Sequence, residues 1–495
     1  MSEIELKYCV DARRASAVEA ALRRAGGVSS TIESRYFDTA QGHLADAGLS
    51  LRLRRVDGTW EQTLKAPGAG PAVREEETVP RPGTWGSDGP PVAPDLHAGT
   101  KAGKALDAAL RDAGEGALQF AHASFIRRRI VEVEVGDARI EVAFDQGEIR
   151  SNGKSEPVCE VEYELKSGPA AALASVARAG VREHGLWLST LAKSTRGDRL
   201  FRAGAARLAR KARQPHLRRS MNGAAILRAV MTACLDQVLA NASEIAAGRV
   251  DDELVHQLRV GLRRMRTAAR ELGSLGPSLG KGWEAAVTGV FRVLGAYRDR
   301  RAVADALQVR LAEAGSPAAQ LQPSGSADAD PVVLVRGGAF QIALLEVLAF
   351  TLETDDDAGL GTNAALSHIG GRLDKLHDHL RRSARSFHRL EPAERHQARK
   401  RLKRLRYVSE LVGSLYGNSA VKRYLDRLAP AQDELGTYMD LVVGSHFAHE
   451  QAEGGAAESW FNVGWLTAEI PASVKRCRKA LRHAARAKPF WAGRG

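Results

Sequence analysis

This sequence of 495 residues contains few cysteines and no CxxC pair, which argues against a zinc-binding domain and against a small domain held together by disulfides. The four cysteines are Cys9, Cys159, Cys234 and Cys477, and their wide separation predicts neither a zinc site nor a disulfide framework. No apolar run is expected to be long enough to cross a bilayer, and the acidic, strand-like start differs from a signal peptide. We therefore expect a cytoplasmic protein that does not enter membranes.

Motifs of nucleotide-binding loops and metalloproteases are also missing. GPSLGKG (276–282) and GTKAGKA (99–105) lack the GxxxxGK[ST] spacing of a P-loop, and HFAHE (446–450) is not HExxH. What remains is a globular composition, with 44% hydrophobic and 26% charged residues. The chain is long enough for two or three domains.

The net charge of +13 belongs to the C-terminal part of the chain. Residues 1–200 contain 27 Lys and Arg against 29 Asp and Glu, whereas residues 201–495 contain 45 against 30. This asymmetry suggests that the C-terminal part binds a polyanion, either nucleic acid or another molecule with many phosphates.

The two parts also differ in hydrophobic periodicity. Up to about residue 200, short segments alternate between apolar and charged residues, which is typical of a mainly antiparallel sheet or barrel. These segments are EIELK (3–7), LSLRLRR (49–55), TWEQTLK (59–65), FIRRRIVEVEV (125–135), ARIEVAFD (138–145) and VCEVEYELK (158–166). Helical patches around 14–25, 101–112 and 169–184 make this part α+β.

Beyond about residue 205 the spacing becomes helical, with breaks expected at 273–282, 314–331 and 354–363. This part repeats itself. His256, Arg259, Arg263 and Arg266 return 140 positions later as His396, Arg399, Lys403 and Arg406, and LGAYRD (294–299) returns as LGTYMD (435–440). The repeat predicts two related helical bundles packed about a pseudo-twofold axis.

Charges on the strand-like segments are sorted by sign, which is unusual for an exposed surface. Glu3 and Glu5 share one face of the first segment, and Arg52 and Arg54 share one face of the second. Like charges gathered in this way repel each other unless a counter-ion lies between them. If the strands close into a barrel with these faces inward, carboxylates line one wall and cations the other.

Such a lumen suits a linear polyphosphate that carries a divalent metal ion. Carboxylate oxygens select Mg²⁺ or Mn²⁺, and guanidinium groups match phosphate oxygens. The metal would lower the pKa of a bound water for in-line attack, while the basic wall neutralises the leaving group. No protein nucleophile is required.

EIELK matches the ExExK signature of CYTH domains, also called triphosphate tunnel metalloenzymes. Further segments follow in the order of that family: LRLR (51–54), TLK (63–65), REEE (74–77), FIRRR (125–129), IEVAFDQGE (140–148), CEVEYEL (159–165) and LAKSTRG (191–197). The chain up to about residue 202 therefore resembles a CYTH domain. The resemblance implies an eight-stranded antiparallel tunnel that binds triphosphate with Mg²⁺ or Mn²⁺.

The resemblance also implies roles for individual residues. The implied metal ligands are Glu3, Glu5, Asp145, Glu160, Glu162 and Glu164, and the implied phosphate-binding residues are Lys7, Arg52, Arg54, Lys65, Arg74, Arg127, Arg129 and Lys193. Lys7 and Glu5 are the candidate catalytic residues, with a metal-bound water as the alternative general base. Arg128 has the opposite parity to Arg127 and is expected to face solvent. His43, His97, His122 and His184 match no motif and are expected to be structural or exposed.

The repeated basic segments keep their His and cationic residues on one side of a helix. VHQLRVGLRRMRTAAREL (255–272) and RHQARKRLKRLRYVSELV (395–412) resemble the helices of CHAD domains, and the resemblance covers roughly 218–490. It implies an all-α domain that binds inorganic polyphosphate through the repeated residues, namely His256, Arg259, Arg263, Arg266, His396, Arg399, Lys403 and Arg406. Nucleic acid is the rival partner, although these helices offer few aromatic residues for base stacking.

The sequence thus predicts a CYTH domain at 1–202, a linker at 203–217 and a CHAD domain at 218–490. The predicted activity is metal-dependent hydrolysis of inorganic triphosphate to pyrophosphate and phosphate, in the cytoplasm and in association with polyphosphate granules. Two alternatives stay open. One is a polyphosphate-binding scaffold without turnover, and the other is a CYTH enzyme that acts on thiamine triphosphate or a nucleoside triphosphate, including cyclisation of ATP.

Overall fold

The computed structural model describes residues 2–68, 70–113, 118–202, 209–280, 282–317, 321, 329–353 and 359–492. Two compact units make up the chain. The barrel unit comprises Met1–Lys211, Leu235–Gln257 and Pro331–Glu353, and the helical unit comprises Ala212–Cys234, Leu258–Asp330 and Thr354–Gly495. Residues 203–208 of the predicted linker, parts of the predicted breaks at 314–331 and 354–363, and the side chains of 296–302 lie outside the described residues.

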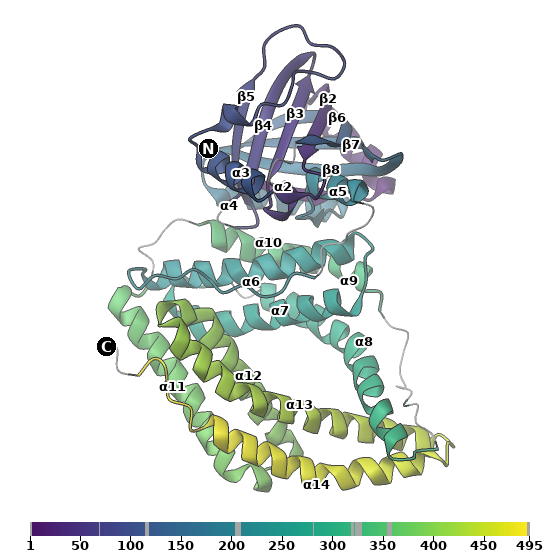
Figure 1. The fold of residues 1–495 in the computed structure, drawn as a ribbon, viewed down its shortest axis with the longest axis vertical. Coiled ribbons are helices and arrows are strands. Elements are labelled where there is room, and N and C mark those ends of the chain that lie inside the picture. Colours follow the sequence, from purple (N-terminus) through teal and green to yellow (C-terminus); the bar gives the residue numbers. More distant parts are fainter. Residues whose placement is uncertain are drawn as a thin grey trace. The chain divides into compact units, whose positions relative to one another are not determined.

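Antiparallel strands form the framework of the barrel unit (Figure 1). They are β1 (Ser2–Cys9), β2 (Val28–Asp38), β3 (Ser50–Val56), β4 (Thr59–Pro67), β5 (Val73–Pro80), β6 (Gln119–Val135), β7 (Ala138–Ser151), β8 (Lys154–Ser167) and β9 (Trp187–Leu188). The sheet order is β5-β4-β3-β2-β6-β7-β8-β1-β9, and β1 also pairs with β5. Strands β1 to β8 therefore close into a barrel, which confirms the predicted eight-stranded tunnel.

Two-residue turns set the register of three hairpins. Asp57 and Gly58 join β3 to β4 with φ of 46° and 90°, and Asn152 and Gly153 join β7 to β8 with φ of 49° and 71°. Positive φ at both positions is the type I′ geometry that matches the twist of the flanking strands. The β6–β7 turn at 136–137 likewise places Val135 opposite Ala138, and the register continues to the pair formed by Arg128 and Asp145.

The apolar faces of the strands point away from the barrel axis and pack against short helices. The helices of this part are α1 (Ala15–Arg24), α2 (His43–Asp46), α3 (Lys101–Asp112), α4 (Ala170–His184) and α5 (Lys193–Phe201), with 3₁₀ turns at Ala12–Arg14 and Pro94–His97. Leu51 of β3 clusters with Leu44 of α2 and Leu106 of α3. Because side chains alternate along a strand, burying Leu51 outside turns Arg52 into the barrel.

The C-terminal part contains helices and no strand among its described residues (Figure 1). Its helices are α6 (Gly223–Ala246), α7 (Asp252–Leu272), α8 (Gly282–Glu313), α9 (Pro331–Arg336), α10 (Gly338–Leu352), α11 (Thr362–Ser386), α12 (Pro392–Val412), α13 (Asn418–Glu453) and α14 (Ser459–Ala484), with 3₁₀ turns at Gly273–Leu275, Phe387–Arg389 and Gly413–Leu415. Helices α7 and α12 both have 21 residues, and each leads through a Gly-Ser-Leu 3₁₀ turn into a long helix. The sequence repeat is thus a repeat of structural elements.

Helix α6 corrects the expectation that no segment is apolar enough to cross a membrane. By length and composition it could do so, although 67% of its most apolar window is buried within the protein. The charges of Arg228, Asp236 and Glu244 interrupt the apolar run without lowering its average enough. Burial of this kind is what the core helix of a soluble fold shows.

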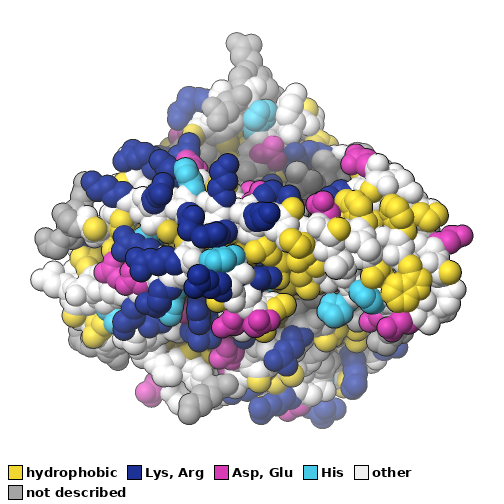
Figure 2. Space-filling view, turned by 90° about the horizontal axis from the view of Figure 1, so that it is seen from below, with side chains coloured by type: hydrophobic (Ala, Val, Ile, Leu, Met, Phe, Trp, Pro, Cys, Tyr) yellow, Lys and Arg dark blue, Asp and Glu magenta, His cyan; other side chains and the backbone are white. Residues whose placement is uncertain are grey.

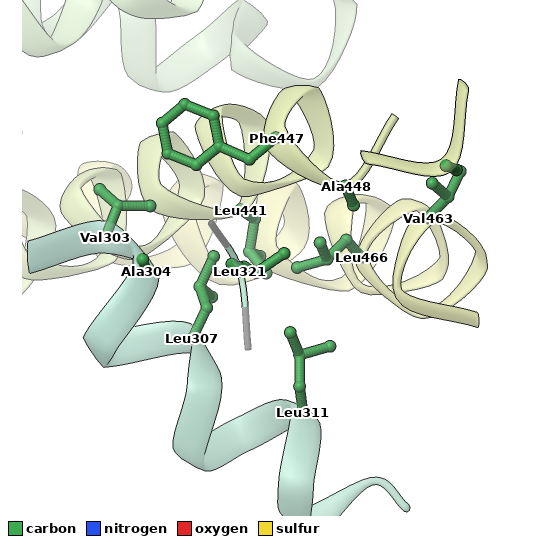
Figure 3. Packing of buried hydrophobic residues seen from close by; sticks show 11 residues of the cluster. Val303, Ala304, Leu307, Leu311, Leu321, Leu441, Phe447, Ala448, Val463 and Leu466 are labelled. Carbon is green, nitrogen blue, oxygen red and sulfur yellow. The ribbon is translucent and has the colours of Figure 1, made fainter. Parts of the chain in front are cut away.

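A buried apolar cluster joins three helices of the helical unit (Figure 3). Leu307 and Leu311 of α8 pack in it with Leu441 of α13 and Leu466 of α14. A Cβ atom at Gly444 of α13 would collide with the Leu307 side chain, so glycine permits this close approach.

Candidate functional site

The barrel encloses a cavity of about 500 Å³ whose wall is rich in charged side chains. The predicted site residues that line it are Glu3, Glu5, Lys7, Arg52, Arg54, Lys65, Arg74, Asp145, Glu162, Glu164 and Lys193. Carboxylates come mainly from β1, β7 and β8, whereas the cations of β3 and β4 come from the other side of the closed sheet. The charges sorted by strand therefore face an enclosed space rather than bulk solvent.

Three carboxylates gather at one place in the barrel. Asp145, Glu160 and Glu162 each offer an oxygen, and these atoms lie within 4.8 Å of one another. Lys193, the first residue of α5, contacts all three, with its Nζ 2.7 Å from Asp145 and 2.8 Å from Glu162. Arg128 donates to both oxygens of Asp145, at 2.6 and 2.7 Å, and also contacts Glu162. We call Asp145, Glu160 and Glu162 the acidic cluster.

The cations around Glu162 keep this carboxylate of the acidic cluster ionised. Burial alone would raise the pKa of Glu162, but Lys193 and Arg128 lower it well below the ordinary value. Burial would likewise lower the pKa of Lys193, yet the three carboxylates raise it well above its ordinary value. Both groups are therefore charged across the physiological pH range.

On β1, in contrast, two carboxyl groups have a pKa raised above the ordinary value, so they bind a proton more readily. Burial is the largest cause that raises the pKa of Glu3, to about 8. Burial also raises the pKa of Glu5, and the negative charge of Glu162 adds to the effect. Glu76 of β5 differs, because Lys65 and Arg52 overcome the effect of burial and lower its pKa to about 2. A cation placed beside Glu5 and Glu162 would favour the ionised form of both.

These residues fit a divalent metal ion. Mg²⁺ and Mn²⁺ prefer hard oxygen ligands, and the acidic cluster supplies several at a spacing that one ion could bridge. Glu5 adds a carboxyl group whose pKa is raised first by burial and then by the like charge of Glu162. Glu160 is 1% exposed and meets Lys193 and Arg196, while Glu164 lines the cavity 2.7 Å from Lys166.

The arginines of β3 that line the cavity have hydrogen-bond donors that meet no acceptor among the described residues. Arg52 and Arg54 line the cavity, and the Nε atom of each is buried without a hydrogen-bond partner among the described residues. Their carboxylate neighbours are at long range, with Arg52 3.7 Å from Glu76 and Arg54 3.5 Å from Glu61. Buried donors of this kind are costly unless a ligand satisfies them, and phosphate oxygens would do so.

The predicted direction of three β6 arginines is wrong. Arg127 is exposed and donates to Gln146 at 2.6 Å on the outside of the barrel. Arg129 also points outward, where it bonds Glu19 at 2.8 Å. Arg128, expected to face solvent, lines the cavity instead. The reason is the β6–β7 register, which puts Arg128 directly opposite the inward-facing Asp145.

Several cavity residues were not among the predicted site residues. They include Arg128, Tyr36, Ser34, Ser124, Glu76, Glu141 and Lys166, together with uncharged and apolar residues. For Arg128 a signal existed, since a two-residue turn at 136–137 fixes which residues of β6 and β7 share a face. For Tyr36 and Ser34 the signal was weak, because the residues of β2 that line the cavity, Ile32, Ser34 and Tyr36, are uncharged.

Helix α5 brings Lys193 to the acidic cluster, and its neighbours hold it there. Arg196 Nε donates to Glu156 at 2.6 Å, and its Nη1 reaches Glu160 at 3.4 Å. A Cβ atom at Gly197 would collide with the buried imidazole ring of His122, so glycine allows the helix to pack against β6. Lys7, on β1, donates to the backbone oxygen of Leu191 just before this helix.

The repeated basic segments form α7 and α12, which meet in the helical unit. Arg263 Nη1 donates to Tyr407 at 3.5 Å, and Arg264 pairs with Glu410 at 2.6 Å. On α7, Arg259, Arg263 and Arg266 surround the ring of Phe291, at 5.4, 5.2 and 5.9 Å from its centroid. His256 lies on the same helix, one turn before Arg259.

On α12 the predicted residues His396, Arg399, Lys403 and Arg406 are all half-buried, consistent with one shared face. Burial lowers the pKa of His396, and the neighbouring Lys400, Arg399 and Lys403 lower it further. Figure 2 shows a face of the molecule on which Lys and Arg side chains gather, with histidines among them. A surface that crowds like charges in this way suits an anionic partner.

Family models match both the N-terminal and the C-terminal part of the sequence. Residues 1–195 match the CYTH domain and residues 229–449 match the CHAD domain. The chain carries a CYTH domain followed by a CHAD domain. Among curated proteins, an inorganic triphosphatase from Haemophilus influenzae is 38% identical to the CYTH–CHAD chain over 65 residues, which are 13% of this chain and 18% of the length of that relative.

Solved structures similar to the CYTH–CHAD chain cover each part separately. The CHAD domain from the plant Ricinus communis is 25% identical and covers 56% of this chain and 97% of its own, with a TM-score of 0.45. A putative adenylyl cyclase from Hippeastrum, described as having a dominant triphosphatase activity, is 17% identical and covers 38% of this chain and 89% of its own, with a TM-score of 0.27.

Proposed function

We propose that this protein is a metal-dependent inorganic triphosphatase, which hydrolyses triphosphate to pyrophosphate and phosphate inside the CYTH tunnel. The observation that carries the proposal is the enclosed cavity, in which a carboxylate wall faces the buried and unsatisfied Nε donors of Arg52 and Arg54. A phosphate chain with a bound cation supplies the charge that each wall lacks. The match to a curated inorganic triphosphatase supports the same reaction class.

In this proposal Arg52, Arg54, Lys65 and Arg74 bind the phosphate oxygens, because they line the cavity and carry donors. The acidic cluster, with Glu3 and Glu5, would hold Mg²⁺ or Mn²⁺. When bound, the ion would polarise a phosphoryl group and acidify a water molecule. Lys193 and Arg128 fix the carboxylates of the cluster in place. Lys7 and Glu5 lie on one face of β1 and line the cavity, where they are the candidate catalytic residues.

We also propose that the CHAD domain binds inorganic polyphosphate along α7 and α12, through the repeated residues His256, Arg259, Arg263, Arg266, His396, Arg399, Lys403 and Arg406. The meeting of the two helices through Arg263 and Tyr407 supports a shared basic face. Such binding would bring the enzyme to polyphosphate in the cytoplasm, for example at granules. A flexible linear polyanion needs no base-reading elements, unlike nucleic acid.

Phosphate release from purified full-length protein tests the enzymatic proposal. The assay compares triphosphate, ATP, thiamine triphosphate and long-chain polyphosphate, each with Mg²⁺, with Mn²⁺ and with EDTA. We expect triphosphate to be the best substrate, EDTA to abolish release, and Glu5→Gln to lower kcat by about a hundredfold or more. Glu134→Gln is the matched control, because Glu134 is exposed on the same barrel and does not line the cavity.

Each of the other outcomes would replace the proposed function with a different one or overturn the proposed site. Polyphosphate binding without release from any substrate would make the chain a scaffold. Release from thiamine triphosphate or ATP in preference to triphosphate would keep the tunnel chemistry and replace the substrate. Release that EDTA or Glu5→Gln leaves unchanged would overturn the proposed site.

A further inference from the structure

The cavity wall also contains apolar residues, and three of them are leucines that lie outside strands β1 to β8. Leu188 lies on β9, Leu239 on α6 and Leu348 on α10, and all three line the cavity beside Ser189 and Thr190. Leu239 and Leu348 are each 1% exposed, and both belong to the barrel unit although they come from the CHAD part of the sequence. We call these three residues the leucine ledge.

Hydrogen bonds fix the leucine ledge in position. The backbone N–H of Leu188 donates to Gln341 of α10 at 2.8 Å, and that of Thr190 donates to Ser243 of α6 at 2.9 Å. Ser243 follows Leu239 by four residues, and Gln341 precedes Leu348 by seven, so each pair shares one face of its helix. The same helix faces thus hold the strand and present the leucines.

A buried ion pair links the ledge to the acidic cluster. Arg199 of α5 makes two hydrogen bonds to Glu244 of α6, one of them 3.1 Å long. Helix α5 begins at Lys193, which contacts the three carboxylates of the cluster. Since Glu244 lies five residues after Leu239 on α6, the connection from the leucine ledge to Lys193 runs through α6, the Arg199–Glu244 pair and α5. The distance between ledge and cluster is therefore set by secondary structure rather than by a loop.

We propose that the leucine ledge is the stop against which the terminal phosphate of a linear substrate rests. A phosphate oxygen that moved among isobutyl groups would lose its hydration and gain no donor, which is costly for a charged group. The ledge thereby determines which phosphoanhydride bond lies beside the acidic cluster. This inference rests on the proposed function and adds to it a determinant of bond selectivity.

The reaction itself remains hydrolysis of a phosphoanhydride. The oxygen of water forms a bond to one phosphorus, the bridging P–O bond breaks, and a proton passes to solvent. Triphosphate cannot report the position of the stop, because cleavage of either of its bonds gives the same products. Linear tetraphosphate can, since its terminal bond gives phosphate and triphosphate while its central bond gives two pyrophosphates.

The test is the product ratio from tetraphosphate in initial-rate conditions with Mg²⁺, read by phosphorus NMR. We expect the wild-type protein to cleave mainly one kind of bond, and Leu239→Ala, Leu348→Ala and the double variant to shift the ratio by about tenfold. The matched controls are Leu235→Ala and Leu344→Ala. Both leucines are fully buried on the same two helices, one turn from the ledge residues, and neither lines the cavity.

The controls separate bond selectivity from loss of stability, because both kinds of variant remove the same buried methyl groups. If the alanine variants do not fold, Leu348→Val, with Leu344→Val as its control, shortens the side chain at a smaller cost in packing and is read in the same way. A second readout needs no turnover. In calorimetric titrations with EDTA, the affinity for tetraphosphate relative to triphosphate is expected to change in the ledge variants and to stay constant in the controls.

A product ratio within about twofold of wild type in the ledge variants would overturn the inference and leave the triphosphatase proposal standing. An equal shift in the controls would also overturn it. If the wild-type protein releases no phosphate from triphosphate, the proposed function and the inference fall together.

Discussion

The tunnel and the basic face of the helical unit both concentrate charge, but they compensate it differently. In the tunnel, Lys193 and Arg128 lie within hydrogen-bond distance of Asp145, so cations neutralise part of the carboxylate wall. On the helical face, Arg259, Arg263 and Arg266 gather around the uncharged ring of Phe291.

This difference indicates what each region can bind. A wall that already contains both signs is matched by a ligand with both signs, such as a phosphate chain with a divalent cation. A surface on which like charges crowd together is matched by an anion alone, and its binding should depend strongly on salt. The predictions below test this contrast, starting with the largest expected effect.

The strongest prediction concerns the basic wall of the tunnel. Arg54→Ala removes a buried guanidinium group that lines the cavity, and we expect kcat/KM for triphosphate to fall by about a hundredfold or more. Arg127→Ala is the control, since this arginine faces the outside of the barrel. Steady-state kinetics of wild type and of both variants measure the change in kcat/KM. Equal losses in both would mean that the tunnel does not hold the phosphates.

A smaller effect is expected on the helical face. Removing Arg399 and Lys403 together should lower the affinity for long-chain polyphosphate by about tenfold at low salt and flatten its dependence on NaCl. Fluorescence anisotropy of labelled polyphosphate measures both quantities. Lys422→Ala with Arg423→Ala removes two exposed cations from α13 and should change neither. If this control pair weakens binding as much, the α12 face is not the site.

Cation binding in the tunnel should strengthen as pH rises. Burial raises the pKa of Glu3 to about 8, so below that pH a bound cation must displace a proton from this carboxyl. The affinity for Mn²⁺ is expected to rise by up to about tenfold per pH unit up to that pKa and then level off. Without a cation, the stability that this raised pKa contributes is lost as pH rises through about 8. Calorimetry of wild type and Glu3→Gln should show the steeper dependence in wild type, whereas identical profiles would contradict the assignment.

A buried histidine without a charged partner gives the smallest effect. Burial lowers the pKa of His122 to about 3, and its ring stacks on Tyr36 at 4.4 Å. Its contribution to stability is complete above its ordinary pKa of about 6.5 and is lost as pH falls from there toward 3. The free energy of unfolding should fall by up to about 1.4 kcal/mol per pH unit from this group.

Urea unfolding at several pH values measures this effect. His122→Phe keeps an aromatic ring against Tyr36 and cannot titrate, so its stability should fall less steeply in acid than that of wild type. Equal slopes for the two proteins would show that His122 is protonated at little cost in the folded state.

Alternation of residue types was sufficient to predict most of the barrel and its inward charges. Leu51 and Leu53 must be buried, and in a strand that leaves Arg52 and Arg54 on the opposite face. The same rule applied to β6 alone gave the wrong parity, because the three consecutive arginines of FIRRR are flanked by apolar residues of both parities, at 125–126 and 130–131. Only the pairing of β6 with β7 selects Arg128.

Other features depend on contacts that no local pattern contains. Lys193 reaches the acidic cluster because α5 packs against β6 and β8, and the sequence near Lys193 gives no sign of its partners. Leu239 and Leu348 look like ordinary core residues of apolar helices, and only the fold brings them to the cavity. Tertiary packing, rather than propensity or motif, decides these positions.

The most direct test of the central claim is to locate the cation and the phosphates. Anomalous diffraction from a crystal of the full chain with Mn²⁺ and triphosphate should show the ion inside the barrel, bound by oxygens of the acidic cluster, and phosphate groups beside Arg52 and Arg54. An ion and a triphosphate bound only outside the barrel would contradict the account.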